Sequence, residues 1–281
     1  MQKRKLLNSP RLLELKKKRR RIFLDKILLL MLGFFVVCAG LSYVSRINRL
    51  NINKIEVTGN KVLDAETIKK AVQEKITGNY LWILPRTNVL LYPENKVKSE
   101  LLNNFKRIKD ITLSIKDRNT LEVSISEREA KYIWCGKQAD LEDEQQCYFM
   151  DENSFIFDEA PYFSGEVYFK FYGSASVGSY FSQQNFEQLI SFKKALENFG
   201  LKPAGLTILN NGDIKMLLSP GSSSSTQPEI IFKKDANLEK VAENLEAALT
   251  TEPLQSKFKN KYASLLYIDL RYGNKVYYKF R

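Results

Sequence analysis

Residues 27–45 read ILLLMLGFFVVCAGLSYVS, a stretch of 19 residues that contains no charged side chain. As an α-helix rising about 1.5 Å per residue, this stretch is roughly as long as the 30 Å hydrocarbon core of a bilayer is thick. A buried helix of a soluble domain rarely lacks charged residues on every side. The stretch therefore predicts one transmembrane helix, which divides the chain into a short tail and a long C-terminal part.

The tail before this stretch is strongly basic. Residues 1–26 contain eleven lysines and arginines and two acidic residues, so they carry +9 of the net charge of +12. Because basic residues flank membrane helices on the cytoplasmic side, we expect a cytoplasmic tail at 1–26, a membrane helix at 27–45 and an extracytoplasmic location for 46–281. The tail is expected to meet anionic lipid. Nucleic-acid binding, and cleavage of a signal sequence near Val37-Cys38-Ala39, are the weaker alternatives.

The first region beyond the membrane stretch, residues 46–129, has the pattern β-α-α-β-β. A short apolar strand at 52–57 and a turn precede a helix that begins after Asp64, and a second helix begins at Pro93. The segments 111–115 and 121–126 then alternate apolar and polar residues, as half-buried strands do. The pattern predicts a small sheet with two helices on one side.

The second region, residues 130–281, predicts a mixed, mainly antiparallel β-domain with two helices, which makes the whole chain α+β. The tripeptide Asn210-Asn211-Gly212 is a strong hairpin turn between two of the strands. Strands are expected at 132–134, 148–150, 155–157, 167–171, 206–209, 214–218 and 230–233, with two more between 265 and 280, and helices at 185–199 and 238–249.

Four segments carry a resemblance to a known family. IEVTGN at 55–60 and TLEVSISER at 120–128 resemble the first and last strands of a POTRA domain. CYFMDENSFIFDEA at 147–160 and IDLRYGNKVYYK at 268–279 resemble the early hairpin and the closing strands of the FtsQ/DivIB β-domain. With the basic tail and single span before them, their order resembles the FtsQ/DivIB family of bacterial cell-division proteins. The resemblance implies a POTRA domain at 46–129 and an extracytoplasmic β-domain at 130–281.

Catalysis is not expected. The chain has no histidine, which excludes Ser-His-Asp, Cys-His and histidine–metal sites. No phosphate-binding glycine motif occurs, and the SxxK matches at 191–194 and 256–259 lack the SDN and KTG segments of penicillin-binding enzymes. We therefore expect no cofactor, metal or small-molecule substrate. A membrane-anchored cell-wall enzyme and a POTRA-bearing transport or secretion scaffold are the alternative functions.

The cysteines outside the membrane stretch are Cys135 and Cys147, which flank a predicted hairpin. In an oxidising compartment two such residues can form a disulfide. Their spacing does not show whether their Cα atoms approach within about 7 Å, as a disulfide requires. The pairing therefore stays open at the level of sequence.

In the last strand, 275–280, Lys275, Tyr277 and Lys279 alternate with Val276, Tyr278 and Phe280. A terminal strand often lies at a sheet edge, where it either accepts a partner strand or remains solvated and is protected by its lysines. The resemblance favours the first reading, because FtsQ-like proteins accept an FtsB/DivIC partner here and also assemble with FtsL. It implies a scaffold that holds division proteins at the septum. The candidate partner-binding residues are Leu270, Arg271, Tyr272, Gly273, Asn274, Val276, Tyr277 and Tyr278.

Overall fold

The structure is a computed structural model, and it describes residues 10–136, 146–163, 166–220 and 227–281. The acidic segment at 140–144, expected in the hairpin between 132–134 and 148–150, and the serine-rich segment at 221–226, expected as a loop, both lie outside the described residues. The chain divides into two compact units. The first unit comprises residues 1–101 and 110–125, and the second comprises residues 102–109 and 126–281.

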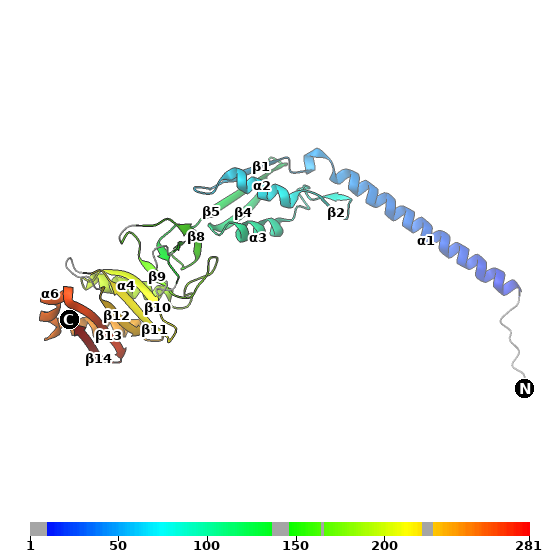
Figure 1. Cartoon of the computed structure of the whole chain (residues 1–281). Helices are drawn as coiled ribbons and strands as arrows, with labels where there is room; N and C mark the ends of the chain where they lie inside the picture. The colour runs from blue at the N-terminus through cyan, green and yellow to red at the C-terminus, as the bar shows by residue number, and fades with distance from the viewer. Residues whose placement is uncertain (1–9, 137–145, 164–165, 221–226) are drawn as a thin grey trace, which may run out of the picture. The chain divides into compact units, whose positions relative to one another are not determined.

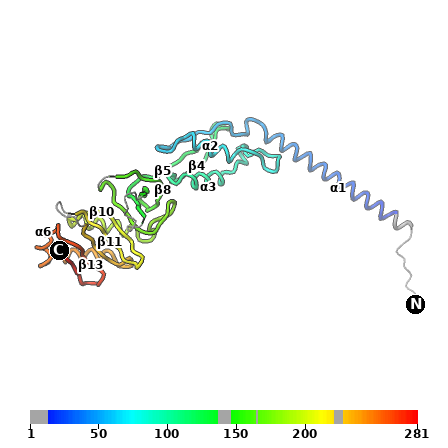
Figure 2. The backbone as a smooth tube through the Cα atoms, in the orientation of Figure 1, coloured from blue at the N-terminus to red at the C-terminus, as the bar shows by residue number. Residues whose placement is uncertain are grey.

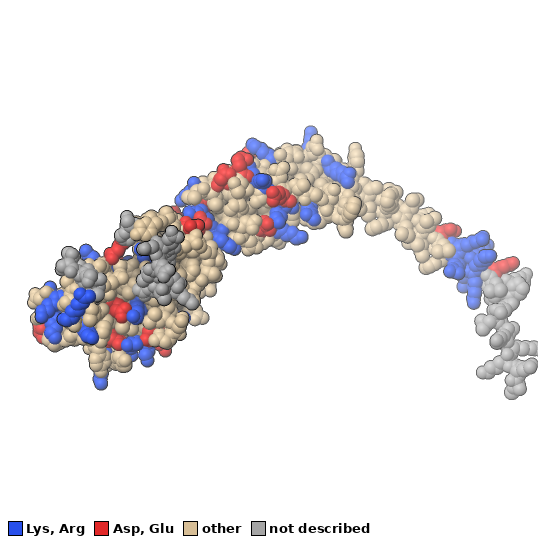
Figure 3. All heavy atoms as spheres, in the orientation of Figure 1, with Lys and Arg blue, Asp and Glu red and all other residues tan. Residues whose placement is uncertain are grey.

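One long helix, α1, opens the first unit and spans Pro10–Ser45. It extends the predicted membrane helix towards the N-terminus because leucine, lysine and arginine, all good helix formers, fill the segment after Pro10. Within the described residues it is the one helix that is long and apolar enough to cross a membrane, and its most apolar 18-residue stretch has a mean hydropathy of 2.5. Figure 2 follows α1 as one unbroken helix, and Figure 3 shows its basic cluster followed by an uncharged stretch.

The rest of the first unit is a three-stranded sheet in the order β1-β5-β4, in which β1 and β5 are parallel. The N-cap Asp64 accepts a hydrogen bond from Thr67 N at 2.8 Å, which starts α2 where the sequence predicts it. The hairpin formed by β2 and β3 was not predicted. The elements are η1 (Asn48–Leu50), β1 (Lys54–Thr58), α2 (Ala65–Ile76), β2 (Asn79–Tyr80), β3 (Leu84–Pro85), α3 (Glu94–Asn104), β4 (Ile108–Lys116) and β5 (Thr120–Glu127).

Apolar residues of both helices pack on this sheet. Ile68 and Val72 of α2, Val97 of α3 and Val123 of β5 are fully buried. The turn after β1 requires glycine, because Gly59 has a φ of 81° and a Cβ there would lie 2.1 Å from the carbonyl oxygen of Ile125. The predicted β-α-α-β-β arrangement is therefore present, with the β2–β3 hairpin inserted between its helices.

The second unit contains a nine-stranded sheet in the order β14-β13-β12-β11-β10-β9-β6-β7-β8. Most neighbouring pairs are antiparallel, and the parallel pairs are β9 with β10, β6 with β9, and β12 with β13. Figure 1 shows these elements in order along the chain. They are β6 (Tyr132–Trp134), β7 (Cys147–Met150), β8 (Ile156–Ala160), β9 (Lys170–Tyr172), α4 (Phe186–Asn198), β10 (Pro203–Ile208), β11 (Asp213–Leu218), β12 (Glu229–Lys233), α5 (Leu238–Thr250), α6 (Leu254–Lys261), η3 (Tyr262–Ser264), β13 (Leu265–Tyr272) and β14 (Lys275–Phe280).

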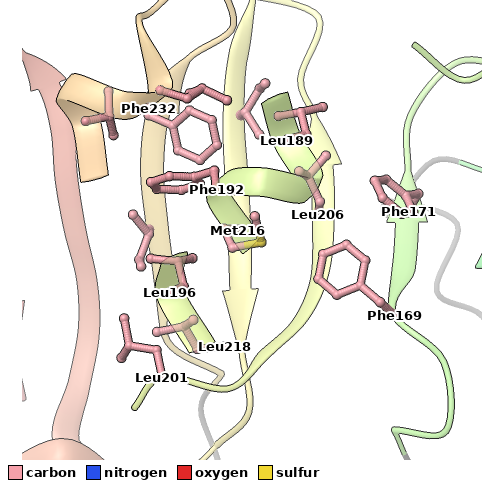
Figure 4. Close-up of a cluster of buried hydrophobic side chains, with 14 of the residues drawn as sticks. Phe169, Phe171, Leu189, Phe192, Leu196, Leu201, Leu206, Met216, Leu218 and Phe232 are labelled. Carbon is pink, nitrogen blue, oxygen red and sulfur yellow. The ribbon is translucent and has the colours of Figure 1, made fainter. Parts of the chain in front are cut away.

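Helices cover one face of this sheet. Leu189, Phe192 and Leu196 of α4 meet strand residues such as Met216 and Phe232 in one buried cluster, shown in Figure 4. The opposite face of the same strands carries charged pairs such as Lys215 with Glu229, whose charged atoms are 3.0 Å apart. The short helix α6 was not predicted, because its eight residues, LQSKFKNK, are mostly polar and show little apolar periodicity.

Candidate partner-binding edge

Strand β14 is the outermost strand at one end of the nine-stranded sheet. It pairs antiparallel with β13, in a register that places Tyr278 opposite Ile268 and Tyr277 opposite Asp269. The tight turn between the two strands contains Gly273, whose φ of 64° favours glycine. No strand in the described part of the chain pairs with the outer side of β14. Its outer side is therefore the place at which another chain can add a strand.

The direction of the backbone groups of β14 follows from one hydrogen bond at its end. The backbone N–H of Arg281 donates to the carbonyl oxygen of Ser264 at 2.8 Å, towards the β13 side. Backbone groups alternate in direction along an antiparallel strand, so those of Val276, Tyr278 and Phe280 point to the open side. These three residues provide the donors and acceptors that strand addition requires.

Two tyrosines are exposed beside this edge. Tyr272 is 57% exposed and Tyr277 is 50% exposed, and their rings meet edge to face with centroids 5.3 Å apart. By contrast, the side chains of Val276, Tyr278 and Phe280 pack against the core cluster. Exposed tyrosines held against each other offer a large, rigid contact area with polar tips, which suits a protein interface.

An ion-paired network supports the end of the hairpin. The Arg271 guanidinium binds Asp269 and Asp213 with nitrogen–oxygen distances of 2.6 Å to each carboxylate. Burial raises the pKa of the Asp269 carboxyl, but hydrogen bonds from the Arg271 side chain and backbone outweigh burial and hold this pKa below its usual value. The two carboxylates raise the pKa of Arg271 in turn. Arg271 is therefore a positioning residue for the hairpin, fixed by its acidic partners.

The structure corrects the role of Leu270. Its side chain is only 4% exposed and lies in the core cluster, so it is not available as a contact side chain.

The sequence analysis missed two supporting residues, Asp213 and Asn244. The Asn244 side chain donates to the carbonyl oxygen of Gly273 at 3.1 Å, and Asn244, Gly273 and Asn274 line a hollow of about 220 Å³ beside the turn. No local sequence signal links these residues to the hairpin, because the contacts are long-range.

Cys135 and Cys147 lie at the other end of the sheet. Trp134 of β6 pairs with Tyr148 of β7, which places the two cysteines across from each other. Their Cα atoms are 4.2 Å apart and the structure joins them in a disulfide. The structure thus shows that the two cysteines are close enough to form a disulfide, which the sequence could not show. Titration of free thiols is the test of the bond.

The SxxK segments lie on exposed helix surfaces. Ser191 and Lys194 are exposed on α4, and Ser256 and Lys259 are exposed on α6. The Ser256 hydroxyl donates to the Glu252 carboxylate rather than meeting a lysine. Neither segment has the enclosed serine–lysine geometry that an acyl-transfer site would require.

Comparison with known proteins identifies one domain of the chain. Residues 50–128 match the family described as the POTRA domain, FtsQ-type. The search of curated proteins found no match to the chain. The matched segment begins at the last residue of η1, five residues after α1 ends, and contains the three strands of the sheet, both covering helices and the β2–β3 hairpin. An FtsQ-type POTRA domain directly after an N-terminal apolar helix supports an FtsQ/DivIB-like protein.

Proposed function

We propose that the protein is a membrane-anchored scaffold of bacterial cell division, which binds other division proteins and positions them at the septum. Two features support the proposal: the FtsQ-type POTRA domain after an apolar helix, and the open strand β14 with exposed tyrosines beside it. The scaffold has no substrate. Its membrane anchor confines it to two dimensions and so raises the effective concentration of its partners.

The open edge of β14 is the observation that carries the partner assignment. An extracytoplasmic strand of an FtsB/DivIC-like protein would pair with the outward backbone groups of Val276, Tyr278 and Phe280, while Tyr272 and Tyr277 would contact its side chains. Lys275 and Lys279 are exposed on the same strand and favour an acidic partner segment. An FtsL-like protein would join the complex through the FtsB/DivIC-like partner.

Replacing Val276 with proline tests this assignment directly. Proline removes the outward N–H at this position, so the full chain in nanodiscs should bind an FtsB/DivIC-like extracytoplasmic peptide roughly tenfold more weakly. Val276→Ala is the matched control, because it shortens the same side chain and keeps the N–H. Circular dichroism checks that both variants fold. Equal affinities for the folded proline and alanine variants would place the partner site elsewhere.

The proposed topology places residues 1–26 in the cytoplasm and both folded regions, 46–129 and 130–281, outside it. Its support is the basic cluster on the N-terminal side of the uncharged stretch, visible in Figure 3. A reporter enzyme that is active only outside the cytoplasm should be active when fused after Arg281. A stable but inactive fusion would show the opposite orientation. It would also contradict the assignment of β14 to an extracytoplasmic partner.

A further inference from the structure

An apolar tip projects from the first unit at the β2–β3 hairpin. The turn between these strands contains Leu81, Trp82 and Ile83, which are 85%, 92% and 40% exposed. Leu81 and Trp82 have φ angles of 46° and 68°, in the left-handed region that residues other than glycine seldom adopt. Nearby in the sequence, Leu90 is 82% exposed. Large apolar side chains exposed together in this way mark an interaction surface.

Hydrogen bonds hold this tip beside the last turns of α1. The Ser42 hydroxyl of α1 donates to the carbonyl oxygen of Ile83 at 3.0 Å. The carbonyl oxygen of Ser45, the last residue of α1, accepts from the side-chain amides of Asn51 at 2.9 Å and Asn88 at 3.1 Å. Figure 1 shows β2 next to this end of the helix, and β3 contacts α1. The tip is therefore fixed beside the C-terminal end of the apolar helix.

The charges around the tip are of one sign. No acidic residue occurs between Asp25 and Glu56, or between Glu74 and Glu94, whereas Arg46, Arg49 and Arg86 lie within these segments. The Arg86 guanidinium lies 5.2 Å from the centre of the Tyr80 ring on the hairpin. Cationic side chains beside exposed tryptophan and leucine match the phosphate and acyl layers of a lipid interface.

We propose that the β2–β3 hairpin inserts Leu81 and Trp82 into the outer bilayer interface as a second membrane contact beside α1. The occupant of the apolar tip is lipid, because hydrogen bonds to the end of α1 keep the tip at the membrane whether or not a protein partner is present. A single helix leaves a domain free to turn about the helix axis. Two contacts would restrict that turning and fix which face of the POTRA domain meets the membrane.

Tryptophan fluorescence of the full chain in lipid vesicles tests the proposal. The chain has two tryptophans, and the Trp82→Phe variant retains only Trp134, which is 9% exposed and donates a hydrogen bond to the carbonyl oxygen of Gly173. The difference between the two proteins is therefore the signal of Trp82. In vesicles of phosphatidylethanolamine and phosphatidylglycerol with brominated acyl chains, the Trp82 signal should be quenched at least about twofold and shielded from aqueous acrylamide.

A matched pair of variants separates the hairpin from general surface hydrophobicity. Leu81→Ser should reduce the quenching of Trp82 by brominated lipid by roughly half, because the tip loses an inserted side chain. Val62→Ser should leave the quenching unchanged, since Val62 is also apolar and 68% exposed but lies outside the hairpin.

Three results would overturn the proposal. Acrylamide does not reach a ring that lipid shields, so free quenching of Trp82 by acrylamide in vesicles would show that the tip is in water. Shielding from acrylamide without quenching by brominated lipid would show that protein, such as a second copy of the chain, covers the tip. Failure of the chain to float with the vesicles would refute the membrane anchor itself, and the hairpin contact with it.

Discussion

At one end of the nine-stranded sheet, the outer strand β8 begins with backbone groups that are already bonded: Ile156 N–H donates to Ser179 O at 3.0 Å, and Ile156 O accepts from Gly178 N at 2.8 Å. At the other end, β14 directs the backbone groups of three residues to the open side. The disulfide between Cys135 and Cys147 and the buried pair of Arg128 with Asp151 also lie near β8. The comparison teaches that the chain itself covers the start of β8, the closed end, whereas no described strand covers β14, the open end, which leaves room there for the proposed partner.

The largest effect is expected at the closed end. Asp151 is 3% exposed and accepts hydrogen bonds from Arg128 at 2.6 Å and from the backbone of Asn153 and Phe155 at 2.9 Å each. Asp151→Ala leaves the Arg128 charge without its partner, so the free energy of unfolding should fall by about 3–5 kcal/mol. Chemical denaturation measures the loss. Glu152→Ala is the control, because its ion pair with Lys109 is exposed to solvent and its loss should change the free energy of unfolding far less.

Reducing the disulfide is expected to have the next largest effect. The bond between Cys135 and Cys147 closes a short loop, so its loss should lower the free energy of unfolding by about 3 kcal/mol in the chain-entropy description. Peptide binding at β14 should be unchanged while the protein stays folded. Thiol titration of unreduced, unfolded protein comprising residues 46–281 should find no free thiol. Two reactive thiols would show that the bond does not form.

A charge at the open end should affect binding but not stability. Tyr272 is 57% exposed, so Tyr272→Glu should leave the free energy of unfolding nearly unchanged and weaken peptide binding by about 2 kcal/mol, the scale of an interface hot spot. Calorimetric titration measures the affinity. Tyr162→Glu is the matched control, because Tyr162 is 90% exposed in the same unit. Equal losses in both variants would indicate a non-specific charge effect rather than a site at β14.

The smallest effect is expected at the support of the open end. Arg271→Lys keeps the positive charge but loses the planar contacts to Asp269 and Asp213, so the free energy of unfolding should fall by about 1 kcal/mol.

The same network predicts a dependence on pH. Because the folded protein holds the pKa of Asp269 below its usual value, this residue contributes stability above about pH 4 that is lost as pH falls through the folded pKa. In Arg271→Lys the pKa of Asp269 should lie closer to its usual value, so the stability lost between neutral and acid pH should be smaller, as the free energy of unfolding measured at several pH values would show. Identical acid profiles for the two proteins would contradict the role assigned to Arg271.

Much of the fold could be predicted from local patterns. Alternating residues such as Ile111 and Leu113 are buried in β4, and the apolar stripe of α2 is buried at Ile68 and Val72. The predicted α+β class is confirmed, including the large, mostly antiparallel sheet. These predictions succeed because period-2 and period-3.6 patterns record which side of an element faces the core. Ile115, in contrast, is 36% exposed at the end of β4, where the alternation continues beyond the core.

The candidate edge was only partly predictable. The alternation of apolar and polar residues at 275–280 predicted a strand. It did not predict which backbone groups face the open side; the hydrogen bond from Arg281 N–H to the carbonyl oxygen of Ser264 showed this. Leu270 was expected among the contact residues because it adjoins Arg271 and Tyr272, yet it faces the core. Asp213 reaches Arg271 from a strand that lies far away in the sequence.

The sequence by itself determined the apolar helix, the basic tail and, apart from the β2–β3 hairpin and α6, the strand and helix pattern of both units, because each of these depends on residues close together in the chain. Only the tertiary structure decided which strands became edges, which side chains supported the hairpin at 273–274, and that Leu81 and Trp82 lie beside the end of α1. Those features depend on contacts between residues that the sequence separates widely. Local periodicity contains no information about such contacts, which packing and hydrogen bonding establish only when the chain folds.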